Sequence, residues 1–126
     1  MDLFVLLAAS AVAPILVHEL GHWLAARRAG VPLAWSFGWG RLALGRIAIP
    51  VPRGLWSAPL PEGDERLRRI RRAGFRVELP FAALALVAGI LWGGVPPLVA
   101  GGSAAVVAVL HRVLYPLYAG DRSDLA

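Results

Sequence analysis

The sequence of 126 residues contains no cysteine and no lysine. Without cysteine, the chain has neither disulfide bonds nor thiolate metal ligands, so any metal site must use histidine and carboxylate side chains. All 13 basic residues are arginines, and the formal net charge is +5. Aromatic residues are not interleaved with these arginines in the manner of nucleic-acid-binding surfaces, and we therefore expect no nucleic-acid partner.

Charged residues are also scarce, at 17% of the chain, whereas 58% of the residues are hydrophobic. This balance is too apolar for an ordinary soluble domain and is typical of a small membrane protein. The N-terminus lacks the basic region of a signal peptide, because Asp2 is its only early charge, and the apolar run continues to Leu24. We interpret this run as a retained transmembrane helix.

Three apolar stretches predict three transmembrane helices, over residues 3–29, 79–95 and 98–118. Each is close to the length that crosses a hydrocarbon core of about 30 Å, although the second is short. Pro96 and Pro97 are expected to form the turn between the second and third helices. The sequence thus predicts a single membrane-embedded α-helical domain that spans residues 1–126.

Residues 31–76, between the first two spans, have a different pattern. Trp35, Phe37 and Trp39 alternate with small residues, which predicts one or two β-hairpins at the membrane interface. We expect Pro50 and Pro52 to interrupt the strand pattern. Residues 62–72 read as a short charged helix that lies against the headgroups of the lipid bilayer.

Eleven of the thirteen arginines lie between the first and second spans. They are Arg27, Arg28, Arg41, Arg46, Arg53, Arg66, Arg68, Arg69, Arg71, Arg72 and Arg76. The positive-inside rule makes this segment cytoplasmic and the N-terminus external. We therefore expect an integral protein of a bacterial inner membrane, whose functional site is close to the cytoplasmic face.

The stretch His18-Glu19-Leu20-Gly21-His22 places three ionisable residues inside the first apolar helix. Positions i and i+4 share a helix face, so two imidazoles at this spacing can bind one Zn²⁺. Glu19 is then placed to act as a general base. Taken singly, the histidines could be hydrogen-bonded core residues and the glutamate a proton relay. Three such groups at membrane depth favour a shared metal-binding function.

A catalytic zinc site usually has three protein ligands and one position for water. The residues alone leave four candidates for the third ligand. They are Glu78, His111, Asp121 and Asp124. The two aspartates follow the third span, which ends on the same side of the membrane as the first. His111 also reads as a packed, hydrogen-bonded histidine, and Glu78 as an interfacial partner of nearby arginines.

The stretch LVHELGHWLAARRAGVPLAWSFGWG resembles the first motif of the site-2 protease family of intramembrane zinc metalloproteases. This resemblance implies that His18 and His22 bind zinc and that Glu19 activates water. The C-terminal YPLYAGDRSDLA looks like the second motif of the family, which implies Asp124 as the third ligand and Asp121 as the fallback. Here leucine follows Asp124, where glycine is usual.

The stretch RRAGFRVELPFAALAL looks like a degenerate form of a third family motif, with Glu78 where asparagine is usual. The resemblance implies that Glu78 contacts substrate. It also implies that the region 31–52, with Trp35, Phe37 and Trp39, holds an extended substrate segment.

The leading hypothesis is an intramembrane zinc endopeptidase that cleaves a transmembrane segment of another membrane protein. The first alternative is a catalytically degenerate relative that binds a membrane protein. The second alternative is a small transporter or proton-relay protein that uses His18, Glu19 and His22 and requires neither zinc nor Asp124.

Overall fold

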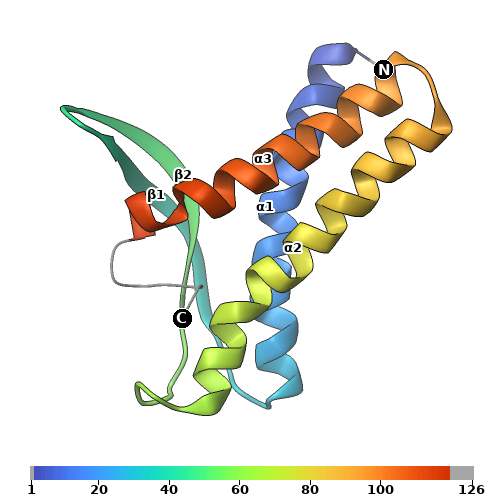
Figure 1. Cartoon of the computed structure of the whole chain (residues 1–126). Coiled ribbons are helices and arrows are strands. Elements are labelled where there is room, and N and C mark those ends of the chain that lie inside the picture. Colours follow the sequence, from blue (N-terminus) through green and yellow to red (C-terminus); the bar gives the residue numbers. More distant parts are fainter. Residues whose placement is uncertain (1, 120–126) are drawn as a thin grey trace.

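The computed structural model describes residues 2–119, without the side chains of residues 52–55 and 116–119. Three long helices form a bundle, and a β-hairpin lies beside it (Figure 1). The helices are α1 (Leu3–Arg28), α2 (Glu65–Trp92) and α3 (Val95–Ala119), and each contacts the other two. All three contain a stretch long and apolar enough to cross a membrane. The helix predicted over residues 3–29 is confirmed almost to the residue.

The second predicted span is only the latter part of a longer helix. Helix α2 begins at Glu65, where the Asp64 carboxylate caps it by accepting the Arg66 backbone N–H at 2.8 Å. It then continues through Pro80 to Trp92. The charged segment and the second span are therefore one helix. The predicted start at residue 79 marks the beginning of the apolar stretch, whereas the helix itself begins 14 residues earlier.

The predicted turn at Pro96 and Pro97 is wrong. Helix α2 ends at Trp92, and the chain reverses at Gly93 and Gly94, whose φ angles are 81° and 90°. Such positive φ values are accessible to glycine at little cost. The two prolines instead occupy the first turn of α3, where their missing N–H groups have no intrahelical partner to lose.

A single hairpin fills the segment between α1 and α2. Strands β1 (Ala34–Leu44) and β2 (Ile47–Ser57) pair in an antiparallel manner, with Leu44 opposite Ile47. The two-residue turn has Gly45 in its first position at φ 64°, as a type II′ turn requires. Leu44 and Ile47, which close the turn, form a hydrogen-bonded pair. Along the two strands from this point, non-hydrogen-bonded pairs alternate with hydrogen-bonded pairs.

The expectation that Pro50 and Pro52 interrupt the strand is wrong, and the register explains why. Pro50 lies opposite Arg41 and Pro52 opposite Trp39. Counted from the turn, both are non-hydrogen-bonded pairs, so the absent N–H groups of the prolines remove no bond between β1 and β2. The prolines instead leave the outer edge of β2 without two donors.

Glycines allow the helices to approach closely. A Cβ added to Gly21 of α1 would lie 2.6 Å from the Ala73 carbonyl oxygen of α2. A Cβ on Gly89 of α2 would collide with the Pro97 carbonyl oxygen of α3. Ala26 of α1, Ile70 of α2 and Val31 form a small apolar core against the base of the hairpin. The helices are thus held near enough for side chains from all three to meet.

Candidate metal centre

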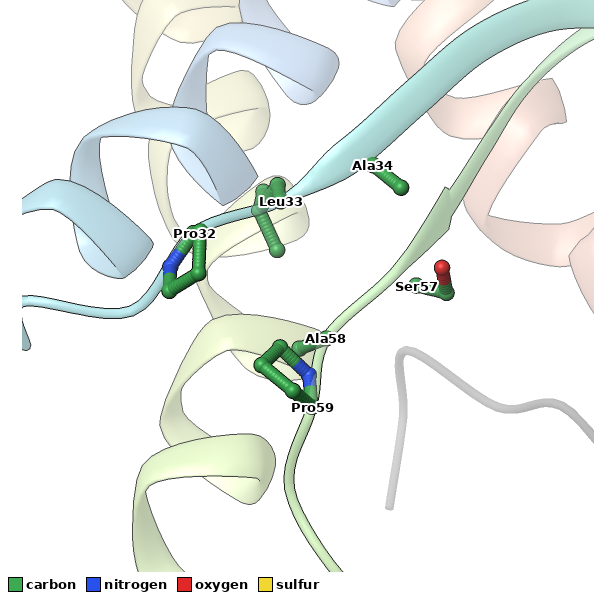
Figure 2. Close-up of a pocket in the computed structure, with 6 residues that line it drawn as sticks. All are labelled: Pro32, Leu33, Ala34, Ser57, Ala58 and Pro59. Atoms are coloured by element: carbon green, nitrogen blue, oxygen red, sulfur yellow. The ribbon is translucent and has the colours of Figure 1, made fainter.

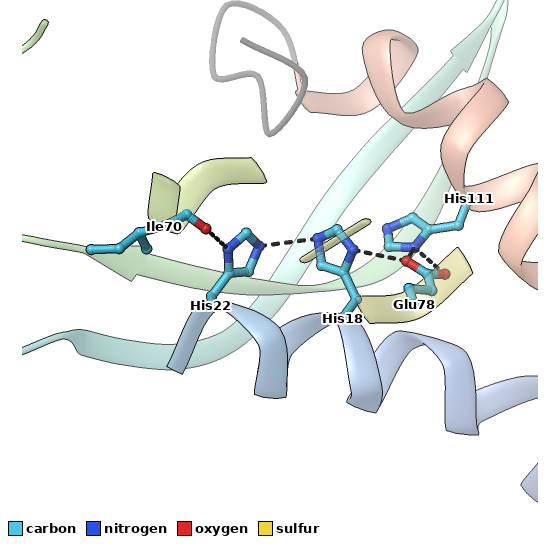
Figure 3. Close-up of polar contacts among 5 residues, drawn as sticks. All are labelled: His18, His22, Ile70, Glu78 and His111. Atoms are coloured by element: carbon cyan, nitrogen blue, oxygen red, sulfur yellow. Dashed lines mark hydrogen bonds and ion pairs between the residues drawn. The ribbon is translucent and has the colours of Figure 1, made fainter. Parts of the chain in front are cut away.

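His18 and His22 are buried between the helices, each with 1% of its surface exposed. As the helical spacing predicted, their rings lie on one face of α1, with the two Nε2 atoms 3.0 Å apart (Figure 3). The Nδ1 atom of each ring faces away from this contact and has an oxygen partner. The contacts of the two Nδ1 atoms therefore fix the orientation of both rings.

The partners of Nδ1 determine the tautomers. His22 Nδ1 lies 2.7 Å from the Ile70 carbonyl oxygen, which can only accept, so this nitrogen carries the proton. His18 Nδ1 lies 2.8 Å from Glu78 Oε2, and a carboxylate likewise accepts. In their neutral forms, both histidines then direct an Nε2 lone pair toward the same point.

This geometry fits a zinc ion. Zinc binds histidine nitrogens at about 2.0–2.1 Å, and a tetrahedral angle between two of them separates the nitrogens by about 3.3 Å. The observed 3.0 Å requires only a small rotation of the rings. One nitrogen of each histidine and a carboxylate oxygen of Glu19 all lie within 4.8 Å of one another. The donor types, nitrogen and carboxylate oxygen, are those that zinc prefers.

The ring of His18 is held by α2 on two sides. A Cβ on Gly74 would lie 2.5 Å from His18 Cε1 and Nε2, so only glycine leaves room for the ring. The Phe75 ring packs edge-on, with its centroid 4.4 Å from that of His18. Gly74 was not anticipated from the sequence. A glycine inside a helical pattern signals a close approach, but it does not identify the neighbour.

Glu78 is fully buried and lies behind His18, on the side away from His22 (Figure 3). His111 of α3 binds the same carboxylate, with its Nδ1 atom 2.9 Å from both oxygens. The reading of His111 as a packed, hydrogen-bonded histidine therefore agrees with the structure. His18, Glu78 and His111 form a second group whose ligand atoms lie within 4.8 Å of one another.

Both strands of the hairpin reach the histidine motif. Trp35 donates its Nε1–H to Glu19 Oε2 at 3.0 Å, and the Trp56 ring lies 5.1 Å from that of His22. Trp35 and Trp56 are directly opposite in the register, so they share one face of the sheet. The alternating aromatic pattern predicted a role for Trp35 but not for Trp56, which lies outside that pattern.

Phe37 and Trp39 lie farther along β1 and are 55% and 75% exposed. Phe37 packs against Trp35, with ring centroids 4.5 Å apart. Asp124 and Asp121, the predicted third ligand and its fallback, lie outside the described residues. The predicted substrate contact of Glu78 stays a prediction.

No protein-family model, curated protein or solved structure matches the chain. The resemblance to the site-2 protease family therefore rests on the quoted sequence motifs alone.

A separate open cavity of about 450 Å³ lies where the hairpin joins the helices (Figure 2). Its lining consists of Pro32, Leu33, Ala34, Ser57, Ala58 and Pro59. None of these side chains is titratable or able to bind a metal strongly. The groups that could bind a metal therefore lie at the histidine motif and not around this cavity.

Proposed function

We propose that the protein is an intramembrane zinc endopeptidase that hydrolyses a peptide bond in a transmembrane segment of another membrane protein. The observation that carries the proposal is the pair of Nε2 atoms of His18 and His22, which face each other while both Nδ1 atoms are held by acceptors. A zinc ion held there would polarise a scissile carbonyl and lower the pKa of a water molecule.

Glu19 is the residue placed for proton transfer. It follows His18 directly, and its carboxylate lies within reach of both histidine nitrogens. In this role it takes the proton of the attacking water and passes it to the leaving amine. The indole of Trp35 fixes one carboxylate oxygen through its N–H, so the second oxygen can face the reacting atoms. Asp124 is proposed as the third zinc ligand, with Asp121 as the fallback.

The substrate is proposed to bind as an added strand on the outer edge of β1. Trp35, Phe37 and Trp39 occupy non-hydrogen-bonded pairs, so their backbone N–H and C=O groups point away from β2. The outer edge of β2 carries Pro50 and Pro52 and lacks those donors. An unwound transmembrane segment needs partners for its backbone groups, and the edge of β1 supplies them beside Glu19.

The first experiment uses Glu19→Gln in detergent-solubilised or vesicle-embedded protein. The probe is a tagged single-span reporter whose transmembrane segment carries a Gly-Pro pair to promote unwinding. We expect cleavage of the reporter by the wild type and its loss in Glu19→Gln, with the zinc content of both proteins equal. Cleavage that survives the substitution would contradict the assignment of Glu19.

A second experiment tests the choice of edge. Phe37→Ala removes the side chain, whereas Phe37→Pro also removes the outward N–H of β1. Ala48→Pro removes an outward N–H from β2 and serves as the matched control. We expect reporter cleavage to fall further in Phe37→Pro than in Phe37→Ala and to be unaffected by Ala48→Pro. Equal effects of the two Phe37 variants would rule out pairing at this edge.

We also propose that the protein lies in a bacterial inner membrane with an external N-terminus. Arg27 and Arg28 end α1 at the same end of the bundle at which α2 begins with its arginine-rich turns (Figure 1). Since the chain has no cysteine, single-cysteine variants report the topology directly. In whole cells, an impermeant maleimide should label Trp92→Cys and not Glu62→Cys, and the opposite pattern would invert the proposed orientation.

A second candidate function is a proton relay. The contacts from the Ile70 carbonyl through His22, His18 and Glu78 to His111 form one continuous chain of polar groups across the bundle. This function requires no stoichiometric zinc. The zinc content of the purified protein therefore separates the two candidates.

A further inference from the structure

Glu78 is the most deeply buried ionisable residue that the proposed chemistry leaves without a role. None of its surface is exposed, although it lies within a helix long and apolar enough to cross a membrane. A carboxylate at such a depth is costly unless it is paired. The groups that Glu78 contacts must therefore compensate for the cost of its burial.

The carboxylate joins the other two helices. Its Oε2 atom lies 2.8 Å from Nδ1 of His18 in α1, and both its oxygens lie 2.9 Å from Nδ1 of His111 in α3. These are hydrogen-bond lengths, and each places a nitrogen that can donate opposite an oxygen that accepts. Glu78 thus fixes the ring of His18 from behind, while His111 fixes Glu78.

We propose that Glu78 is a positioning residue for the metal site and that His111 supports it. By accepting the Nδ1 proton of His18, Glu78 selects the tautomer whose Nε2 lone pair can bind a metal. Carboxylates that hold a ligating histidine in this way commonly contribute 10–100-fold to metal affinity. The inference rests on the proposed function, because it requires zinc at His18 and His22.

The local chemistry favours this role over a second metal ion bound by His18, Glu78 and His111. On the Glu78 side of His18, donors face an acceptor, so the contacts are complete as hydrogen bonds. On the other side, two Nε2 lone pairs are directed toward one point. A cation would stabilise the two Nε2 lone pairs of His18 and His22. Between His18, Glu78 and His111, it would first have to displace the Nδ1 protons.

The test measures zinc affinity by competition with a chelator, for the purified full-length protein in detergent. Relative to the wild type, Glu78→Ala should bind zinc 10–100-fold more weakly. Glu78→Gln should recover part of the loss, because its amide oxygen can still accept from His18. His111→Phe should lose less than Glu78→Ala. Glu65→Gln, the same change at the exposed start of the same helix, should have wild-type affinity.

A second readout is the tautomer of His18, from the ¹⁵N chemical shifts of its ring in the metal-free protein. We expect the Nδ1–H form in the wild type and a mixture of tautomers in Glu78→Ala. A role limited to packing would leave the tautomer unchanged. If Glu78→Ala does not fold, Glu78→Gln and His111→Phe carry both measurements.

The outcomes are distinguishable. Zinc binding by the wild type with unchanged affinity and tautomer in the variants overturns this inference and leaves the proposed function in place. Two zinc ions per chain, one of which is lost in Glu78→Ala and His111→Phe, would make Glu78 a ligand and also overturn it. Absence of zinc binding in the wild type overturns the proposed function itself.

Discussion

The interior of the helix bundle and the hairpin carry their functional side chains in opposite ways. In the bundle, His18, His22 and Glu78 are each at most 1% exposed, and every ring is fixed by contacts from another helix. In the hairpin, Trp35, Phe37 and Trp39 are between 45% and 75% exposed. In the proposed function, the buried side chains of the bundle would hold the metal and the exposed side chains of the hairpin would contact the substrate.

Gly74→Ala should have the largest effect on stability and zinc binding together, because it alters the interior of the helix bundle beside His18. The added Cβ would lie 2.5 Å from the His18 ring, which must move or force the helices apart. We expect a loss of about 1–3 kcal/mol in the free energy of unfolding, together with weaker zinc binding. Thermal unfolding and chelator competition measure the two effects. Gly102→Ala on α3 is the matched control, because its Cβ would meet nothing within 4 Å.

Gly89→Ala tests whether a packing defect elsewhere in the bundle affects zinc binding. Its Cβ would collide with the Pro97 carbonyl oxygen where α2 meets α3, a contact that does not involve the histidines. We expect a destabilisation comparable to that of Gly74→Ala, but an unchanged zinc stoichiometry in the folded fraction. If Gly89→Ala lost zinc as readily as Gly74→Ala, the metal site would not be a local property of the contact between α1 and α2.

The sequence predicted local features correctly, but it did not predict contacts between residues that are far apart in the chain. The helical spacing of His18 and His22 and the apolar lengths of the spans are local properties, and they correctly predicted a shared face and three candidate membrane helices. The hairpin followed from its alternating aromatic residues. The sequence could not show that Gly74 accommodates His18, or that Glu78 and His111 meet behind it, because these contacts join residues far apart in the chain. Pro50 and Pro52 were wrongly expected to interrupt the strand, since the effect of a proline there depends on the register.

Trp35→Phe should have a smaller effect than the glycine variants. It preserves an aromatic ring but removes the N–H that binds Glu19. One hydrogen bond contributes about 0.5–1.5 kcal/mol, so we expect up to roughly a tenfold loss in reporter cleavage. Zinc affinity should not change. Trp92→Phe is the control, since Trp92 is 83% exposed and ends α2, 14 residues beyond Glu78. Equal losses in the two variants would contradict a specific role for Trp35.

The smallest effect is expected at the start of α2, outside both regions. Hydrogen bonds from Arg71, at 2.6 and 2.9 Å, hold the pKa of Glu62 below its ordinary value of 4.5. The carboxylate therefore contributes stability above that pH, and the contribution is lost as the pH falls through the lowered pKa. Because Glu62 is exposed, the contribution is small. Unfolding curves of wild type and Glu62→Gln should differ slightly at pH 7 and converge in acid, and a difference that grew in acid would contradict this sign.

The central claim is that His18 and His22 bind one zinc ion between the helices. The most direct measurement is the zinc content of purified, zinc-supplied protein, for the wild type, His18→Ala, His22→Ala and Glu19→Gln. The account predicts one zinc ion per chain in the wild type and Glu19→Gln, and its loss in both histidine variants. A wild type without zinc, or histidine variants that retain it, would contradict the claim.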